Sequence, residues 1–425
     1  MDKKAWVVSV NMGYGHQRTA FPLRCLAEGG KIINANDYEG IPDKDRKIWE
    51  DARKGYEFVS GFKRIPLIGE AVFALYNRIQ EILSFYPKRD LSKSNLQLRQ
   101  IYFMLKDGWG RHLIEELRKN PLPFITTFFT TAFMAEYFNY PGDIYCVICD
   151  ADISRTWVAP RPEESRIKYF APNRRVVERL KLYGAKQENI FLTGYPLPLE
   201  NIGGEGMETI REDLGYRLKN LDVKKRFFKY YEPLVSKYLG ALPQSPNHIL
   251  TLMFSVGGAG TQRDIGAKIL RSMSSWIKEK RIKIILAVGI KRKIKKYFEN
   301  NIKKIGLENE NVEIIFSENI NDYFEKFNFA LRKTDILWTK PSELSFYSAL
   351  GLPIIIAPPV GSQEDFNRRW LLKSGFGLTQ EDPNYVGQWI QDWLDFGYLA
   401  EAAMQGFIEG KKFGVLKIKE IIDSK

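Results

Sequence analysis

A glycine-rich turn near the start of the chain carries a histidine suited to acid–base chemistry. Residues 9–20 read Ser-Val-Asn-Met-Gly-Tyr-Gly-His-Gln-Arg-Thr-Ala, an apolar run that passes through a turn into a helical pattern. Backbone N–H groups and the positive end of the helix dipole then face the turn. Because that dipole disfavours an imidazolium, His16 is expected to be neutral and able to accept a proton from a hydroxyl group. A histidine that only caps the turn is the alternative interpretation.

A second glycine-rich turn, in the other half of the chain, is a candidate phosphate loop. Gly257 and Gly258 follow an apolar run and precede a helical pattern. The turn lacks the G-K-[ST] sequence of a Walker loop, and the first turn lacks the full G-x-G-x-x-G pattern. Glycines nevertheless let a ligand approach the backbone closely at such turns.

Two further helix starts in the second half are available to an anion. Lys340 precedes Pro341, a residue that fits the first turn of a helix, and Ser342 and Glu343 follow it. Residues 361–367 then read Gly-Ser-Gln-Glu-Asp-Phe-Asn and open another helical pattern. Both helix N-termini are predicted to offer N–H groups to a phosphate.

Apolar runs that alternate with helical segments predict the elements that position these turns. Such alternation is typical of parallel α/β architecture, and two doubly wound halves explain it most simply. The strands are expected at 6–10, 31–35, 124–127, 144–148, 167–170, 190–193, 249–255, 282–288, 312–316, 336–338 and 354–357.

Composition narrows the class of protein and of partner. The chain has 425 residues, enough for two domains, and 44% hydrophobic residues, which excludes a disordered chain. Its formal net charge of +13 favours an anionic partner: nucleic acid, an acidic membrane surface or a phosphate-bearing ligand. A general spread of surface lysines is the alternative.

Cysteine, histidine and apolar patterns indicate no metal site and no membrane span. Cys146 and Cys149 would face opposite sides of a strand, and His16, His112 and His248 are scattered. The charge-free run 344–363 contains several prolines and glycines, which a spanning helix does not tolerate. No signal peptide is recognised at the N-terminus, and the thiols fit a reducing cytoplasm.

Two segments combine basic and apolar residues. Residues 224–231 read Lys-Lys-Arg-Phe-Phe-Lys-Tyr-Tyr, a pattern suited to nucleobases or a membrane surface, although a helix with packed aromatics and solvated lysines is the favoured interpretation. Residues 67–86 show apolar positions at helical spacing between Lys63-Arg64 and Lys88-Arg89. They predict either an interfacial helix or a helix that faces the core.

Taken together, these motifs resemble the lipid glycosyltransferases of family 28, which include monogalactosyldiacylglycerol and diglucosyldiacylglycerol synthases. They follow the family's order across residues 5–380. The segments that carry the resemblance are Met12–Ala20, Val147–Asp150 with Trp157, Phe170–Pro196, Val256–Gly260, Gly351–Pro353, Gln363–Glu364 and Asn367–Gly375.

The resemblance implies a GT-B fold, in which two Rossmann-like doubly wound domains face a cleft. It implies an inverting transfer without a bound metal or other cofactor, from a UDP-sugar co-substrate to a lipid. His16 becomes the candidate base, Asp150 an alternative base or orienting partner, and Gly13, Tyr14 and Gly15 the acceptor turn. The candidate donor-binding residues are Gly257, Gly258, Lys340, Ser342, Glu343, Gln363, Glu364 and Asn367.

The sequence departs from the family pattern at the expected ribose site. The family has a glutamate five residues before its G-L-P segment, where this chain has Phe346. Glu343 lies about one helical turn earlier and can offer a carboxylate, but at a helix start it competes with a diphosphate for the dipole. Lys340 is positioned to offset that charge.

The sequence therefore predicts an enzyme of two domains. Residues 1–197 form the acceptor-binding domain and residues 247–400 the nucleotide-sugar domain. A connector at 198–246 joins them, and a helix at 401–425 crosses back to the first domain. The expected activity is transfer of a sugar to a lipid acceptor such as diacylglycerol, by a cytoplasmic protein associated peripherally with an anionic membrane. A GT-B sugar-nucleotide epimerase and a non-catalytic nucleotide-sugar or lipid sensor are the alternatives; no nucleic-acid module is recognised, and the sequence does not predict an oligomeric state.

Overall fold

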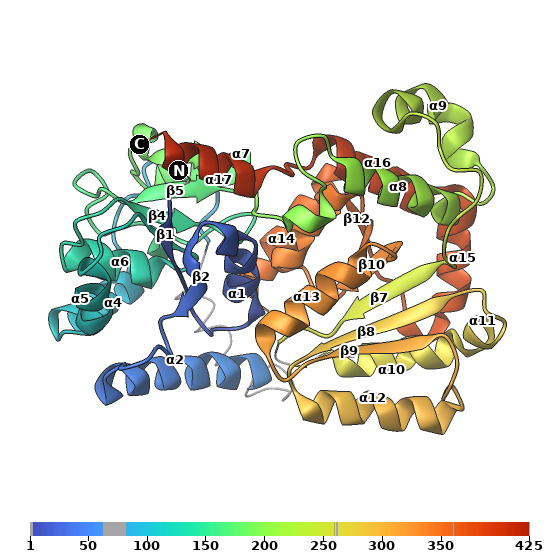
Figure 1. The fold of residues 1–425 in the computed structure, drawn as a ribbon, viewed down its shortest axis with the longest axis horizontal. Coiled ribbons are helices and arrows are strands. Elements are labelled where there is room, and N and C mark those ends of the chain that lie inside the picture. The colour runs from blue at the N-terminus through green and yellow to red at the C-terminus, as the bar shows by residue number, and fades with distance from the viewer. Residues whose placement is uncertain (1–2, 63–81, 259, 261, 360, 425) are drawn as a thin grey trace. The chain divides into compact units, whose positions relative to one another are not determined.

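A computed structural model describes residues 3–62, 82–258, 260, 262–359 and 361–424 (Figure 1). The chain divides into two compact units. Unit 1 comprises Met1–Leu197, Val360–Asn367 and Phe413–Lys425, and unit 2 comprises Pro198–Pro359 and Arg368–Lys412.

Unit 1 is built on a six-stranded parallel sheet in the order β2-β1-β3-β4-β5-β6. Strands β3 and β4 are buried along their whole length, as expected for parallel strands covered on both faces. The strands are β1 (Ala5–Ser9), β2 (Ala27–Asn34), β3 (Phe124–Thr126), β4 (Ile144–Val147), β5 (Lys168–Ala171) and β6 (Ile190–Leu192). The helices are α1 (Tyr14–Ala20), η1 (Phe21–Cys25), α2 (Asp43–Phe62), α4 (Leu96–Lys106), α5 (Arg111–Arg118), α6 (Phe129–Tyr137), η2 (Arg155–Trp157), α7 (Arg174–Leu182), η3 (Gln187–Asn189) and α17 (Gly414–Asp423).

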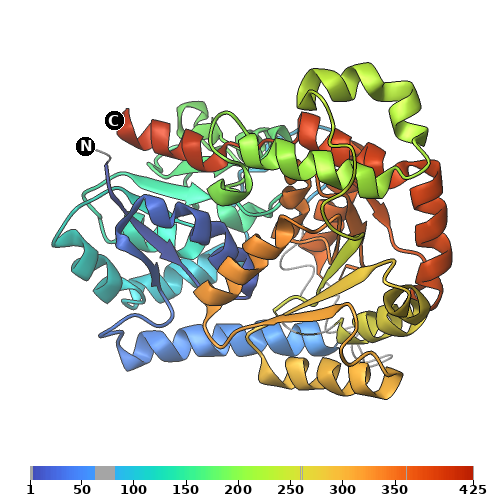
Figure 2. The ribbon, with the colours of Figure 1, turned by 45° about the vertical axis from the view of Figure 1, so that its right-hand side comes forward.

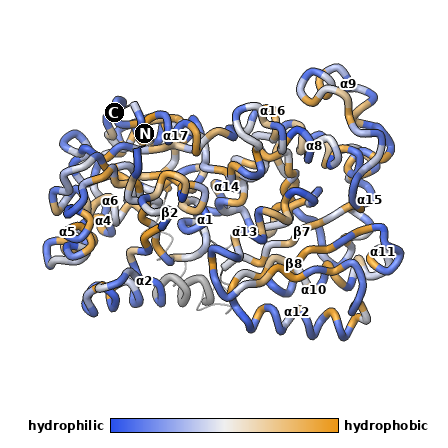
Figure 3. The backbone as a smooth tube through the Cα atoms, in the orientation of Figure 1, coloured by the Kyte–Doolittle hydropathy of each residue, from blue (hydrophilic) through white to orange (hydrophobic). Residues whose placement is uncertain are grey.

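Unit 2 has its own six-stranded parallel sheet, in the order β12-β11-β10-β7-β8-β9. Figure 3 shows hydrophobic residues along β8 and a largely hydrophilic α12 outside the sheet. The strands are β7 (Thr251–Ser255), β8 (Lys283–Gly289), β9 (Val312–Phe316), β10 (Ile336–Thr339), β11 (Ile354–Ile356) and β12 (Gly377–Thr379). The helices are η4 (Leu199–Asn201), α8 (Glu208–Leu221), α9 (Arg226–Leu239), α10 (Arg263–Ser272), α11 (Ser274–Lys278), α12 (Arg292–Ile305), α13 (Ile320–Leu331), η5 (Glu343–Leu350), η6 (Pro383–Tyr385), α15 (Val386–Phe396) and α16 (Tyr398–Glu409), while α14 (Ser362–Ser374) begins in unit 1 and ends in unit 2.

The predicted parallel α/β architecture of two Rossmann-like halves is confirmed. Counted from β7, the strands of unit 2 follow the order of dinucleotide-binding folds, and unit 1 extends the order of flavodoxin-like folds. Each apolar run that predicted a strand contains one. Strand β12 was not predicted, because it is three residues long, begins with glycine and is not fully buried.

Three segments differ from the sequence-based organisation. Residues 198–246, predicted as a connector, are part of unit 2. Residues 360–367 are part of unit 1 although they lie within the predicted second domain. The predicted final helix is two helices, α16 in unit 2 and α17 in unit 1, separated at residues 410–413.

The predicted amphipathic helix at 67–86 lies outside the described residues except for its last five positions. Residues 82–86 are not helical. Phe85 is buried beneath the Arg175 guanidinium, 3.5 Å from the ring centroid, while Tyr86 is exposed. Tyr86 precedes Pro87, and the residue before a proline is disfavoured in a helix.

Within the described part of the chain, no helix is long and apolar enough to cross a membrane.

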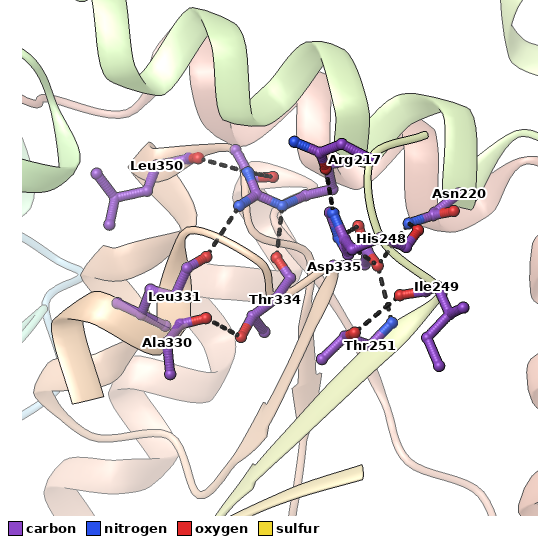
Figure 4. Close-up of polar contacts among 12 residues, drawn as sticks. Arg217, Asn220, His248, Ile249, Thr251, Ala330, Leu331, Thr334, Asp335 and Leu350 are labelled. Carbon is purple, nitrogen blue, oxygen red and sulfur yellow. Dashed lines mark hydrogen bonds and ion pairs between the residues drawn. The ribbon is translucent and has the colours of Figure 1, made fainter. Parts of the chain in front are cut away.

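A buried arginine joins the predicted connector to unit 2. Arg217 of α8 is 2% exposed and donates to the carbonyl oxygens of Thr334 and Leu350 at 2.8 and 3.0 Å (Figure 4). It also donates to those of Gly351 and Leu331. These carbonyls belong to the last residues of α13 and η5 or to residues just after them, where helices leave acceptors unsatisfied. One guanidinium therefore satisfies the ends of two helices and holds α8 against them.

A neighbouring network fixes the start of the central strands. Asp335 is fully buried and accepts hydrogen bonds from Thr251 N–H at 2.8 Å and Asn220 Nδ2 at 3.0 Å (Figure 4). His248 Nε2 lies 3.2 Å from its carboxylate. Burial raises the pKa of Asp335, and the contact with His248 opposes that shift. The network ties the amino ends of β7 and β10 to α8.

We expect Arg217→Met to lower the free energy of unfolding by about 3–5 kcal/mol, because buried carbonyls lose their donors. Equilibrium urea denaturation measures this change. Arg211→Met is the matched control on the exposed face of α8, with an expected change within about 0.5 kcal/mol. Equal losses for the two variants would contradict the structural role of Arg217.

Lys412 is buried at the end of unit 2. Its ammonium donates to the carbonyl oxygens of Phe407 and, at 3.1 Å, Gly410, and lies over the Phe407 ring. Burial lowers the pKa of Lys412 from 10.5 to about 8.

This shift predicts that stability rises with pH. Between about pH 8 and pH 10.5 the unfolded chain binds this proton more strongly, so raising the pH through that window favours the folded state. Across this window we expect the free energy of unfolding of the wild type to rise by at most about 3 kcal/mol, and Lys412→Met to abolish that rise. The test is urea denaturation across the window for the wild type, Lys412→Met and the exposed neighbour Lys411→Met, which should keep the wild-type slope.

Candidate functional site

His16 lies where the order of strands reverses in unit 1. Its turn follows β1, and Thr127 follows the adjacent strand β3. The carboxyl ends of two such strands form the usual ligand crevice of a doubly wound sheet. The Nδ1 atom of His16 lies 2.8 Å from the Thr127 carbonyl oxygen. Thr127 Oγ1 donates to the His16 carbonyl at 3.0 Å, so two hydrogen bonds join the first turn of α1 to the end of β3.

The carbonyl contact selects the tautomer of the neutral ring. A carbonyl oxygen only accepts, so Nδ1 must carry the proton. The lone pair is then on Nε2, and this nitrogen is the one that can accept a proton. Phe128 packs edge-on against the imidazole at a centroid distance of 4.7 Å, and Trp157 lies 6.3 Å away. The Thr127 carbonyl and two aromatic side chains thus contact the half-buried ring and limit its orientation.

The candidate acceptor turn begins with a residue that requires glycine. Gly13 precedes α1 with φ 104° and ψ 170°, a backbone conformation that side chains rarely adopt. Gly13 is exposed, and Tyr14 and Gly15 form the first residues of α1. The prediction that a strand, a glycine turn and a helix start follow one another here is confirmed.

Asp150 lies in the loop after β4 and is held by Asn367. The Asn367 side chain donates to Asp150 Oδ1 at 3.0 Å and accepts from Ala151 N–H at 2.7 Å. Asn367 is fully buried on α14 and belongs to unit 1. The preceding residue, Cys149, has its Sγ 3.5 Å from His16 Nδ1. The loop that carries Asp150 therefore contacts the histidine.

In unit 2 the structure brings Gly257 and Lys340 together. They follow β7 and β10, whose last residues Ser255 and Thr339 are paired in register. A Cβ atom built on Gly257 would lie 3.3 Å from Lys340 Cε, so the lysine stem passes over the glycine turn. Gly257 has φ +76° and Gly258 follows it, half-buried. A cation and a glycine turn thus share the crevice position of the second sheet.

Three polar side-chain atoms of unit 2, outside the predicted site residues, are buried without partners. Thr339 Oγ1, Gln262 Oε1 and Ser345 Oγ are buried without a hydrogen-bond partner, although Gln262 Nε2 donates to the Pro358 carbonyl at 2.7 Å. Buried polar atoms without partners are uncommon and call for an explanation. A bound polar ligand that supplies those partners is one such explanation. Of the three, Thr339 is the one that the sequence places at the end of a strand.

The segment after Pro341 differs from its prediction. Glu343–Leu350 is a 3-10 helix rather than an α-helix, and the side chain of Ser342, at its N-cap, makes no capping hydrogen bond. Glu343 is 8% exposed. Phe346, at the position of the family glutamate, is buried and packs on Trp370 at a centroid distance of 4.9 Å. A 3-10 helix has poorer hydrogen-bond geometry than an α-helix, and anion binding at this helix start stays a prediction.

The candidate donor residues are divided between the units. Gly257, Gly258, Lys340, Ser342 and Glu343 are in unit 2. The other three, Gln363, Glu364 and Asn367, are in unit 1 on α14. Glu364 is buried and Gln363 half-buried.

Among the residues that the structure describes, no group of three or more His, Cys, Asp or Glu side chains is arranged to hold a metal ion. Cys25, Cys146 and Cys149 form no disulfide bond.

We expect Asn367→Ala to destabilise the protein by about 1–3 kcal/mol, because the buried Ala151 N–H loses its acceptor. Thermal denaturation measures the change. Lys373→Ala, at an exposed position of the same helix, is the control and should leave the midpoint nearly unchanged. If the two midpoints agree, Asn367 does not hold this loop.

Comparison with known proteins supports the fold. Residues 244–311 match the family described as a domain of unknown function (DUF6938). No curated protein matches the chain. A solved Listeria monocytogenes structure, assigned as a UDP-N-acetylglucosamine 2-epimerase, aligns with a TM-score of 0.50 at 15% identity, covering 99% of this chain and 96% of that one.

Two other solved structures align at slightly lower scores. The UDP-GlcNAc 2-epimerase of Neisseria meningitidis bound to UDP-GlcNAc has a TM-score of 0.49 at 13% identity, and coverage of 99% and 100%. Acinetobacter baumannii MurG has a TM-score of 0.49 at 10% identity, with the same coverage. With two Rossmann-like units of parallel sheet, the chain has the GT-B fold.

Proposed function

We propose that this protein is an inverting glycosyltransferase that moves a sugar from a UDP-sugar to a hydroxyl group of a membrane lipid such as diacylglycerol. The observation that carries the proposal is the geometry of His16. A hydrogen bond from Nδ1 to the Thr127 carbonyl leaves Nε2 to accept a proton, at the position where a doubly wound sheet binds its ligand.

His16 acts as the general base in this proposal. The acceptor hydroxyl gives its proton to Nε2 while its oxygen forms a bond to the anomeric carbon. The bond from that carbon to the donor phosphate breaks on the opposite face, and UDP leaves. The single displacement inverts the anomeric centre, and the His16 imidazolium that forms keeps its Nδ1–H bond to Thr127.

Asp150 orients the acceptor side of the site. Asn367 fixes its carboxylate from one side, and its neighbour Cys149 contacts the histidine ring. A carboxylate held in this way stabilises a nearby imidazolium and accepts a hydrogen bond from a second substrate hydroxyl. The proposal assigns proton transfer to His16 and positioning to Asp150.

The donor diphosphate binds at the second sheet. The backbone of Gly257 and Gly258 can approach phosphate oxygens closely, and the Lys340 ammonium neutralises charge on the leaving group. The charge of Lys340 provides the stabilisation that a metal ion gives in other transferases.

The lipid acceptor rests on the resemblance of the ordered motifs to lipid glycosyltransferases and on the net charge of +13. The related alternative is a sugar-nucleotide epimerase. An epimerase would release UDP and free sugar without an acceptor, so the two activities separate in one assay.

The test is to incubate the protein with labelled UDP-sugars, with and without diacylglycerol dispersed in detergent. We expect a glycolipid product that requires the acceptor. His16→Ala should lower kcat by about 10²–10⁴-fold and Lys340→Met by about 10²–10³-fold. His112→Ala and the exposed Lys333→Met are matched controls with activity near that of the wild type, and a chelator should leave turnover unchanged.

Three outcomes would contradict the proposal. Absence of glycolipid with every donor removes the transferase activity. Release of free sugar without an acceptor assigns the epimerase instead. Full activity in His16→Ala would show that another group is the base.

A further inference from the structure

The basic and aromatic segment 224–231 is only partly packed. Phe227 is buried and stacks on Tyr231 at a centroid distance of 4.8 Å. Tyr230 and Tyr231, in contrast, are 69% and 44% exposed. The sequence-based interpretation, in which the aromatic residues pack and only the lysines are solvated, therefore holds for Phe227 but not for the tyrosines.

A kink in α9 exposes these rings. Pro233 lies inside the helix, and Tyr231 has the non-helical dihedral angles φ −120° and ψ 15°. Proline lacks an N–H and displaces the carbonyl four residues earlier, so the helix bends before it. Figures 1 and 2 show α9 outside the layers of unit 2, beyond α8 and the end of α15.

The start of α9 is held rigidly against unit 2. The Asp222 carboxylate accepts from the backbone N–H groups of Phe227 and Phe228 at 3.1 and 2.8 Å. Lys224 pairs with Asp395 of α15 at 2.6 Å. Asp222 therefore caps the helix, and the exposed rings follow a segment that is bound to unit 2.

A second segment, distant in the sequence, adds two more exposed rings. Gly397 links α15 and α16 with φ +79°, and a Cβ atom there would lie 3.2 Å from Phe227 N. Glycine thus allows the α15–α16 junction to approach α9 closely. The junction brings Phe396 and Tyr398, which are 57% and 47% exposed.

Together these elements form a shallow pocket of about 290 Å³. Its volume is at the lower limit for sites that enclose a small-molecule ligand. We call six of its lining residues the aromatic patch: Arg226, Tyr230, Tyr231, Phe396, Tyr398 and Glu401. The small volume and the high exposure of its rings favour contact with a surface over enclosure of a ligand.

The charges beside the aromatic patch indicate the kind of surface. Residues 223–231 contain Lys224, Lys225, Arg226 and Lys229 and no acidic residue. Asp395 pairs with Lys224 and also interacts with the charge of Arg226, and the carboxylates of Glu401 in the patch and of Glu232 after the segment leave the cations in excess. Exposed phenyl and phenol rings beside solvated lysines match an anionic bilayer surface, where aromatic rings lie at the level of the headgroups and lysines contact phosphates.

We propose that the aromatic patch and its adjoining cations are a site for binding to anionic lipid bilayers. Tyr230, Phe396 and Tyr398 enter the headgroup region, and Lys225, Arg226 and Lys229 contact lipid phosphates. This site is separate from the residues assigned to sugar transfer. Its role in bringing the enzyme to a lipid acceptor rests on the proposed function, whereas binding to the membrane does not.

The experiment is sedimentation with vesicles of phosphatidylcholine alone and of phosphatidylcholine mixed with phosphatidylglycerol. We expect the wild type to bind the anionic vesicles, more weakly as salt is raised. Because each basic residue near such a surface strengthens binding about fivefold, Lys225→Gln/Lys229→Gln should weaken it by at least about tenfold. Tyr230→Ser/Phe396→Ser should weaken it several-fold at any salt concentration.

Matched controls come from the same unit. Lys293→Gln/Lys296→Gln removes two exposed cations from α12, and Phe329→Ser removes a ring of α13 that is 80% exposed. Both controls should bind vesicles as the wild type does. All the substituted positions are exposed, and thermal denaturation of each variant checks that it is folded.

Each contrary result overturns the proposal. These results are failure of the wild type to bind anionic vesicles, equal binding by the patch variants, equal weakening by the controls, or binding of single-stranded DNA in place of vesicles. None of them depends on turnover. The transferase assay with detergent-dispersed acceptor tests the proposed function separately.

Discussion

The parallel pairing of the central strands, β1 with β3 and β7 with β10, constrains both candidate sites. Between these pairs the order of strands reverses, which is the position where doubly wound sheets generally bind their ligands. In unit 1 this position holds His16 and Thr127, joined by a hydrogen bond. In unit 2 it holds the Gly257 turn and Lys340. The proposed base and the proposed anion-binding cation therefore lie at the same topological position, once in each sheet.

Some arginines of the chain are buried and bind groups inside the protein. Arg217 in unit 2 and Arg155 in unit 1 are both nearly inaccessible, and each donates to several backbone carbonyls. Arg179 is also buried and pairs with Asp152 at 2.8 Å. A guanidinium is suited to this task because its donors are arranged in a rigid plane and it stays charged. The net charge of +13 thus overstates the cations available to an external partner.

The exposed aromatic rings of unit 2 show how a surface is built from separate segments. The kink at Tyr231 turns two tyrosines outward, and Gly397 brings Phe396 and Tyr398 beside them. Neither segment has an unusual length of apolar sequence. Only a glycine junction that tolerates close approach makes them a single surface.

The parallel α/β class, nearly every strand and both glycine turns, with His16 beside the first, could be predicted from the sequence alone. These are local features, encoded by apolar runs and by residues that the backbone requires at particular positions. The tertiary structure decided which strand ends are neighbours, and so the contacts of His16 with Thr127 and of Gly257 with Lys340. It also decided that Asn367 holds Asp150 and that Phe346 is buried against Trp370. Most of these contacts join residues far apart in the chain. Their geometry depends on tertiary packing, which local sequence patterns do not encode.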